Sequence, residues 1–160
     1  KLVEIYKNFG VQTSFSNDII TIKKIESKDL NKSLKLDLSD TPDIAQTIAV
    51  TCFGLGLSCD LNGLHTLKIK ETDRLEALKI ELSKLGANVK VTNNSFHLAP
   101  TFSINNGISI ETYNDHRMAM AFAPLALMTP IIINNPDVVT KSYKDFWKDL
   151  KSLNFNLSKI

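Results

Sequence analysis

Charged residues gather near four expected helix starts, and their types suit the binding of an anion. Residues that can cap a first helical turn occur at four places in the sequence: Thr41, Asp73, Asp115 and Ser142. The free N–H groups of a first turn, together with the positive end of the helix dipole, make a helix start a ready anion site. Seven residues at or beside these starts can do chemistry: Asp43, Lys70, Glu71, Arg74, His116, Arg117 and Lys141.

Three of the cations are placed against the expected dipole. Arg74, Arg117 and Lys141 fall where acidic residues are normally favoured, at a cost of about 0.3–1 kcal/mol each. A bound phosphate or carboxylate would offset that cost. Any one of them, taken singly, reads as a solvated surface cation, so the prediction depends on three occurring together with acidic groups.

Composition narrows the class of protein. The 160 residues are 43% hydrophobic and 22% charged, which predicts one globular domain with a real core. The net charge of +2 gives no argument for nucleic acid or a membrane surface, and no apolar run reaches the roughly 18 residues of a membrane span. Cys52 and Cys59 lack metal-ligand spacing, and a reducing, cytoplasmic setting is expected. Because the chain opens with Lys1, we also expect it to be part of a longer one.

A helix followed by a hairpin recurs along the chain. Apolar residues spaced by four and then three form three triplets, each followed by Gly or Asn: Leu2, Tyr6, Phe9 and Gly10; Leu78, Leu82, Leu85 and Gly86; Phe146, Leu150, Leu153 and Asn154. This spacing predicts one helix face and a left-handed C-cap. Asn17-Asp18 and Asn93-Asn94 interrupt alternating apolar residues after the first two helices, which predicts hairpins.

A second type of helix recurs as well, and the two together define a unit. The segment from Asp43 to Asn62 has the same spacing as the segment from Asp115 to Asn134. The unit reads strand–helix–strand–helix–strand–strand. Residues 1–30 would be the tail of one unit, 31–100 a full unit and 101–160 most of another. The predicted fold is α/β (mixed α+β), with helices packed against mixed sheets.

The segments that carry the charges also resemble a known family. They are LKIKETDRL at residues 67–75, YNDHRMAMAFAPLAL at 113–127, TPDIAQTIAV at 41–50 and PDVVTKSYKDFW at 136–147. Their order and spacing are similar to those of 5-enolpyruvylshikimate-3-phosphate synthases over residues 35–150. Either motif alone would be a weak signal, whereas KETDR and NDHRMAM together are highly specific.

The resemblance implies a two-domain enzyme that transfers enolpyruvyl from phosphoenolpyruvate to the 5-hydroxyl of shikimate 3-phosphate and releases phosphate. Each domain would hold three copies of the unit, with helix N-termini facing the cleft between the domains. The chain would be most of the C-terminal domain. Its partners would be the two substrates and the N-terminal domain, without which we expect it to be inactive. No metal and no organic cofactor are implied.

The resemblance also implies roles for eight residues. Asp43 and Glu71 would be catalytic, moving protons at the hydroxyl and at the methylene carbon. Asp43, Lys70 and Thr66 would contact shikimate 3-phosphate, although the family pattern has asparagine at the position of Thr66. The residues predicted to hold phosphoenolpyruvate are Arg74, Arg117, Lys141 and, with a weaker argument for direct catalysis, His116.

Two alternatives stay open at this stage. A related enzyme transfers enolpyruvyl to UDP-N-acetylglucosamine on the same architecture, but it lacks the pair of motifs quoted above. The chain could also be a non-catalytic phosphate-binding or interaction module.

Overall fold

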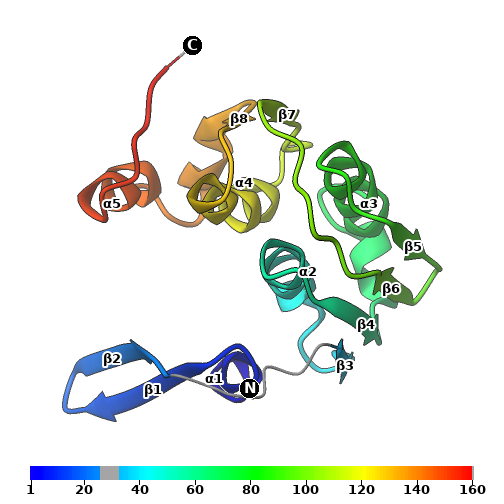
Figure 1. The fold of residues 1–160 in the computed structure, drawn as a ribbon, viewed down its shortest axis with the longest axis horizontal. Helices are drawn as coiled ribbons and strands as arrows, with labels where there is room; N and C mark the ends of the chain where they lie inside the picture. The colour runs from blue at the N-terminus through cyan, green and yellow to red at the C-terminus, as the bar shows by residue number, and fades with distance from the viewer. Residues whose placement is uncertain (26–32, 160) are drawn as a thin grey trace.

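The computed structural model describes residues 1–25 and 33–159, which form helices and three small sheets, one of them mixed (Figure 1). The α-helices are α1 Leu2–Lys7, α2 Ala45–Gly54, α3 Arg74–Lys84, α4 His116–Phe122 and α5 Phe146–Ser152. The 3-10 helices are η1 Pro42–Ile44, η2 His65–Ile69, η3 Ala123–Leu127 and η4 Pro136–Lys141. The strands are β1 Val11–Ser16, β2 Ile19–Lys24, β3 Ser33–Asp37, β4 Ser58–Asn62, β5 Val89–Val91, β6 Ser95–Leu98, β7 Ile108–Ile110 and β8 Ile131–Ile133. The predicted α/β class is confirmed.

A four-stranded sheet with the order β3-β4-β6-β5 supports the middle of the chain. β3 and β4 run parallel, whereas β6 is antiparallel to both of its neighbours. Alternate residues of the two central strands, such as Leu61, Phe96 and Leu98, are buried in the main core. The core also contains apolar residues of α2 and α3, so the helices that begin beside Asp43 and at Arg74 are packed against this sheet.

The order of elements over residues 33–98 is strand, helix, strand, helix, strand, strand. This is the order predicted for one unit. The later elements β7, α4, β8 and α5 repeat its first four steps of strand, helix, strand and helix. The division at 1–30, 31–100 and 101–160 stays a proposal. The left-handed residues predicted after the three amphipathic helices are present, with φ of 75° at Gly10, 99° at Gly86 and 68° at Asn154.

Both predicted hairpins are confirmed, but they differ in their surroundings. β1 pairs with β2 around Asn17, and β5 pairs with β6, which joins the central sheet. The β1–β2 hairpin forms its own two-stranded sheet and extends away from the body of the chain (Figure 1). Its apolar residues Phe15, Ile20 and Ile22 are therefore exposed.

The predicted helix starts are right at two places. Asp73 accepts a hydrogen bond from the backbone N–H of Glu76, and Asp115 accepts one from the backbone N–H of Arg117. Thr41 precedes the 3-10 helix η1, and its side chain makes no capping bond there. Short polar side chains thus cap α3 and α4, the two helices that carry Arg74 and Arg117.

The start predicted at Ser142 is wrong. α5 begins at Phe146, after Asp145, and Ser142 instead follows the 3-10 helix η4. Pro136 favours a helical turn of its own, which ends when the N–H of Ser142 bonds the carbonyl of Val139. Lys141 consequently lies in the last turn of η4, where a cation complements the helix dipole.

The two cysteines belong to the core, as the sequence predicts for Cys52. Both thiols are buried and neither forms a disulfide. The hydrogen bond with Cys52, together with burial, raises the pKa of the Cys59 thiol. Within residues 1–25 and 33–159, no helix combines the length and apolar character needed to cross a bilayer.

Gly63 provides a test of how β4 leads into the segment that carries the charged residues. Its φ is +77°, and an added Cβ would overlap Ser39 Oγ and lie 2.6 Å from Asp37 Oδ1. Gly107 has a similar φ of +66°, and apart from its chain neighbours no atom of residues 1–25 and 33–159 lies within 4 Å of a Cβ added there. In urea unfolding, Gly107→Ala should cost about 1–2 kcal/mol from backbone strain alone. Gly63→Ala should cost about 1–3 kcal/mol more because of the added overlap. Equal losses would show that the close approach at Gly63 is absent.

Candidate active site

Arg74 is the centre of the charged cluster. It is the first residue of α3, and its side chain is only 2% exposed. Its Nε donates to Asp115 Oδ2 at 2.6 Å, one Nη donates to Glu71 Oε2 at 2.6 Å and the other to Asp43 Oδ1 at 3.0 Å. A buried guanidinium is stable only when it is paired and hydrogen-bonded, and three carboxylates satisfy it here.

Asp43 is the residue where the cations meet. It lies in η1, and besides Arg74 its carboxylate is 3.4 Å from Lys70 Nζ and 3.5 Å from an Nη of Arg117. Arg117 also donates to the backbone carbonyl of Asp43 at 3.2 Å. Both arginines of the sequence therefore contact one aspartate. About 38% of the Asp43 side chain remains exposed, which leaves it accessible to a ligand.

Asp115 is completely buried and connects α3 to α4. One oxygen accepts from the backbone N–H of Arg117 at 2.8 Å, while the other accepts from Arg74. The sequence predicted Asp115 as a cap, and no feature of its spacing predicted the contact with Arg74. The two residues before it, Tyr113 and Asn114, have left-handed φ of 51° and 57°. Such backbone is strained for a residue as bulky as tyrosine, and strain of this kind is common at functional sites.

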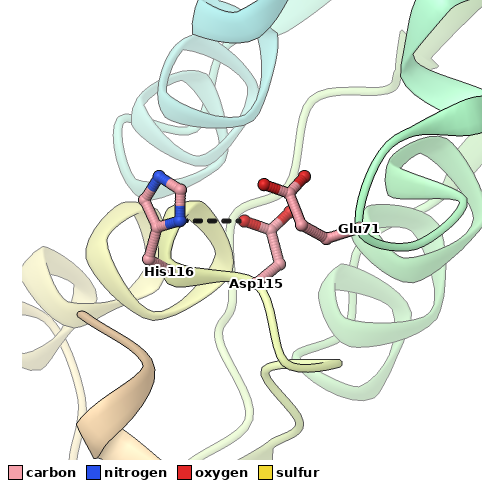
Figure 2. A group of neighbouring side chains, drawn as sticks. All are labelled: Glu71, Asp115 and His116. Atoms are coloured by element: carbon pink, nitrogen blue, oxygen red, sulfur yellow. Dashed lines mark ion pairs between the residues drawn. The ribbon is translucent and has the colours of Figure 1, made fainter. Parts of the chain in front are cut away.

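Glu71, Asp115 and His116 lie side by side (Figure 2). Each offers one potential metal ligand, and these atoms are all within 4.8 Å of one another. The two carboxylates face each other, while the ring of His116 lies beside Asp115, with Nδ1 3.9 Å from its nearer oxygen (Figure 2). Arg74 already compensates both carboxylates with bonds of 2.6 Å, so the cluster is explained without a metal ion.

Lys141 joins the cluster through the backbone. Its Nζ donates to the carbonyl of Asn114 at 2.8 Å, next to Asp115. A cavity of about 280 Å³ lies beside Arg117 and is lined by Thr47, His116, Arg117, Met120, Ser142 and Tyr143. This volume is close to the lower end of small-molecule sites.

The structure therefore brings most of the predicted residues together. Direct ion pairs join Asp43, Lys70, Glu71, Arg74 and Arg117, and Asp115 and Asn114 link His116 and Lys141 to them. Thr66 differs: it lies in η2, and its buried hydroxyl has no hydrogen-bond partner in the part of the chain that the structure describes. Its contact with a substrate stays a prediction.

Known proteins resemble this chain over almost its whole length. A model of the EPSP synthase (3-phosphoshikimate 1-carboxyvinyltransferase) family matches residues 1–150. A 3-phosphoshikimate 1-carboxyvinyltransferase of Bacteroides fragilis (strain YCH46) is 42% identical over 157 residues, which are 96% of this chain and 38% of that protein. One of Clostridium novyi (strain NT) is 33% identical, covering 95% of this chain and 34% of its own. The chain thus spans little more than a third of the length of these relatives.

Solved structures share the fold. An EPSP synthase of Acinetobacter baumannii superimposes with a TM-score of 0.76 at 22% identity, over 94% of this chain and 38% of that one. The enolpyruvyl transferase NikO of Streptomyces tendae gives a TM-score of 0.66 at 16% identity, over 96% of this chain and 34% of that one. With the family model matching most of its length, the chain belongs to the EPSP synthase family.

Proposed function

We propose that the chain supplies one wall of a site that transfers enolpyruvyl from phosphoenolpyruvate to the 5-hydroxyl of shikimate 3-phosphate. The observation that carries the proposal is the cluster around Arg74. There two carboxylates suited to proton transfer, Asp43 and Glu71, are held at fixed positions beside partly exposed cations. Family membership indicates the reaction. The cluster provides carboxylates for its proton transfers and cations for the negative charges of its substrates.

The activity belongs to a longer polypeptide of the kind found in the relatives. This chain covers about 38% of the Bacteroides fragilis protein, and the site lies open beside Arg117 and Asp43. We propose that the remaining polypeptide, the N-terminal domain, provides the opposite wall and further contacts to shikimate 3-phosphate. The chain alone would then bind anions without turnover.

The reaction is an addition followed by an elimination. The 5-hydroxyl oxygen bonds to C2 of phosphoenolpyruvate while C3 gains a proton, which gives a tetrahedral intermediate with a methyl group. The C2–O bond to phosphate then breaks, the methyl group loses a proton, and the enolpyruvyl ether and phosphate remain. Overall, the proton of the hydroxyl leaves with the phosphate.

Asp43 and Glu71 are the proposed proton carriers. We assign Asp43 to the 5-hydroxyl, whose proton it accepts and passes to the leaving phosphate. Glu71, which takes up a proton before the addition, gives it to C3 in the first step and accepts one from the methyl group in the second. Their shared contacts with Arg74 fix the relative positions of the two carboxylates. Because protein groups account for each proton in both steps, the proposal includes no metal and no organic cofactor.

The cations divide into two groups by exposure. Lys70 and Arg117 have side chains about 35% and 38% exposed, and Lys141 is exposed as well, so a phosphate or carboxylate can reach them. Arg74 is almost fully buried among carboxylates. We propose that Arg117, Lys141 and His116 line the phosphoenolpyruvate position and Lys70 and Thr66 the shikimate 3-phosphate position. Arg74 would contact phosphoenolpyruvate only by giving up one of its carboxylates.

Glu71→Gln should lower kcat of the full-length polypeptide by about 10²-fold or more, because the amide cannot exchange a proton with C3. Glu76→Gln is the matched control, since Glu76 lies in the same region, pairs with Lys79 and has an exposed side chain. Steady-state release of phosphate with both substrates measures the effect. Equal activity of the two variants would refute the role of Glu71.

Lys141→Met should raise the KM for phosphoenolpyruvate by about tenfold or more, the usual effect of losing a hydrogen bond to a charged group. Lys148→Met removes a lysine whose side chain is 82% exposed and should leave KM unchanged. Titration of the isolated chain with phosphoenolpyruvate adds a second measurement: the proposal predicts weak binding and no phosphate release. If Lys141→Met left both the KM for phosphoenolpyruvate and its binding to the isolated chain unchanged, Lys141 would not be part of the site.

A further inference from the structure

Glu81 is a buried carboxylate outside the proposed chemistry. It lies in the middle of α3 and is completely buried. Its Oε1 accepts from the hydroxyl of Tyr113 at 2.7 Å, and its Oε2 accepts from the backbone N–H of Glu111 at 3.1 Å. Lys84 Nζ contacts both oxygens at 2.9 and 2.7 Å. Because both oxygens of this carboxylate accept hydrogen bonds, Glu81 holds its donors in place. Two of these donors, Tyr113 and Glu111, belong to the segment that precedes Asp115.

The segment that Glu81 contacts needs to be held. Tyr113 and Asn114 are two consecutive left-handed residues, and tyrosine rarely adopts this backbone conformation. Burial, and then the hydrogen bond to Glu81, raise the pKa of the Tyr113 hydroxyl, so it keeps the proton that it donates. The turn ends at Asp115, whose N–H bonds the carbonyl of Thr112 at 2.8 Å.

One helix thus holds the turn at two points. Arg74 and Glu81 are seven residues apart in α3, which places them on the same face about two turns from each other. Arg74 contacts Asp115 at the end of the turn, and Glu81 contacts Tyr113 and Glu111 at its beginning. A shift of the turn by one residue would break both contacts and displace Arg117, which is two residues beyond Asp115.

We infer that Glu81 is a positioning residue of the candidate active site. It acts through the hydroxyl of Tyr113 to keep Asp115 against Arg74, and to keep Arg117 beside Asp43 and the cavity. This role deepens the function proposed above and depends on it only for its effect on turnover. The placement of Arg74 can be measured without substrate, so failure of the inference and failure of the proposed function are distinguishable.

The chain suits a direct measurement because its sequence contains two arginines. In the chain labelled with [¹⁵N]arginine, the Nε–Hε group of Arg74 should give a signal protected from exchange with water, because Nε donates to a buried carboxylate. Tyr113→Phe should accelerate this exchange by about tenfold or more, as expected when a hydrogen bond to a charged acceptor is lost. Tyr6→Phe is the matched control: it removes the bond of Tyr6 to Thr51, outside the site, and should change the exchange less than about twofold.

A second variant keeps the test decisive if Tyr113→Phe unfolds the chain. Glu81→Gln should also accelerate exchange at Arg74. The amide NH2 group takes the place of one carboxylate oxygen and cannot accept the hydrogen bond from Tyr113 or from Glu111. Because Tyr113 and Glu81 bond each other, the double variant should accelerate exchange by less than the product of the two single effects. Exchange at Arg74 that is unchanged in both single variants, or that responds equally to Tyr6→Phe, would overturn the inference, as would an unprotected Arg74 signal in the unsubstituted chain.

Discussion

The arrangement of the site depends on one interaction, the burial of the Arg74 guanidinium among the carboxylates of Asp43, Glu71 and Asp115. Burying the guanidinium of Arg74 without partners would cost several kcal/mol, and burying the carboxylate of Asp115 without partners would cost a similar amount. Each group therefore requires the others. Because the acids come from η1, the turn before α3 and the start of α4, this requirement fixes three parts of the chain relative to one another. The central sheet and the apolar core bring those parts close, and Arg74 determines their final positions.

This arrangement distinguishes a cation that holds the site together from cations that can bind an anion, which the sequence alone could not distinguish. Arg74, Arg117 and Lys141 were all predicted as anion ligands because all are cations near expected helix starts. Exposure distinguishes them: the Arg74 side chain is 2% exposed among carboxylates, whereas that of Arg117 is 38% exposed and Lys141 is exposed as well. The cluster as a whole balances the charges of Asp43, Glu71 and Asp115 against those of Lys70, Arg74 and Arg117. Lys141 stands outside that balance, so its charge is available to an incoming anion.

Local chemistry explains what the sequence predicted well. The cap of Asp73, the two hairpins and the left-handed residues Gly10, Gly86 and Asn154 depend on neighbours within a few positions, and all are present. One local prediction failed, because Pro136 begins a separate 3-10 helix and Lys141 is therefore not at the beginning of α5. Predictions that required distant contacts were less complete. The roles of Asp115 and Glu81 depend on burial against residues dozens of positions away, and composition or spacing carries no signal for them. The family motifs contribute most to the proposed function, because they contain Glu71, Arg74 and Asp115, which come from two separate parts of the sequence and lie together in the structure.

The central claim concerns the coupling between Arg74 and Asp115, which a double-mutant cycle measures directly. Arg74→Met, Asp115→Asn and the double variant would be unfolded in urea beside the corresponding Lys79→Met and Glu76→Gln set, whose ion pair is exposed. Each single change at the buried pair should cost about 3–5 kcal/mol, because it leaves an uncompensated buried charge. The double variant should cost much less than their sum, with a coupling of about 2 kcal/mol or more, against at most about 0.5 kcal/mol for the exposed pair. Additive losses at Arg74 and Asp115 would contradict the account, because the two side chains would then not depend on each other.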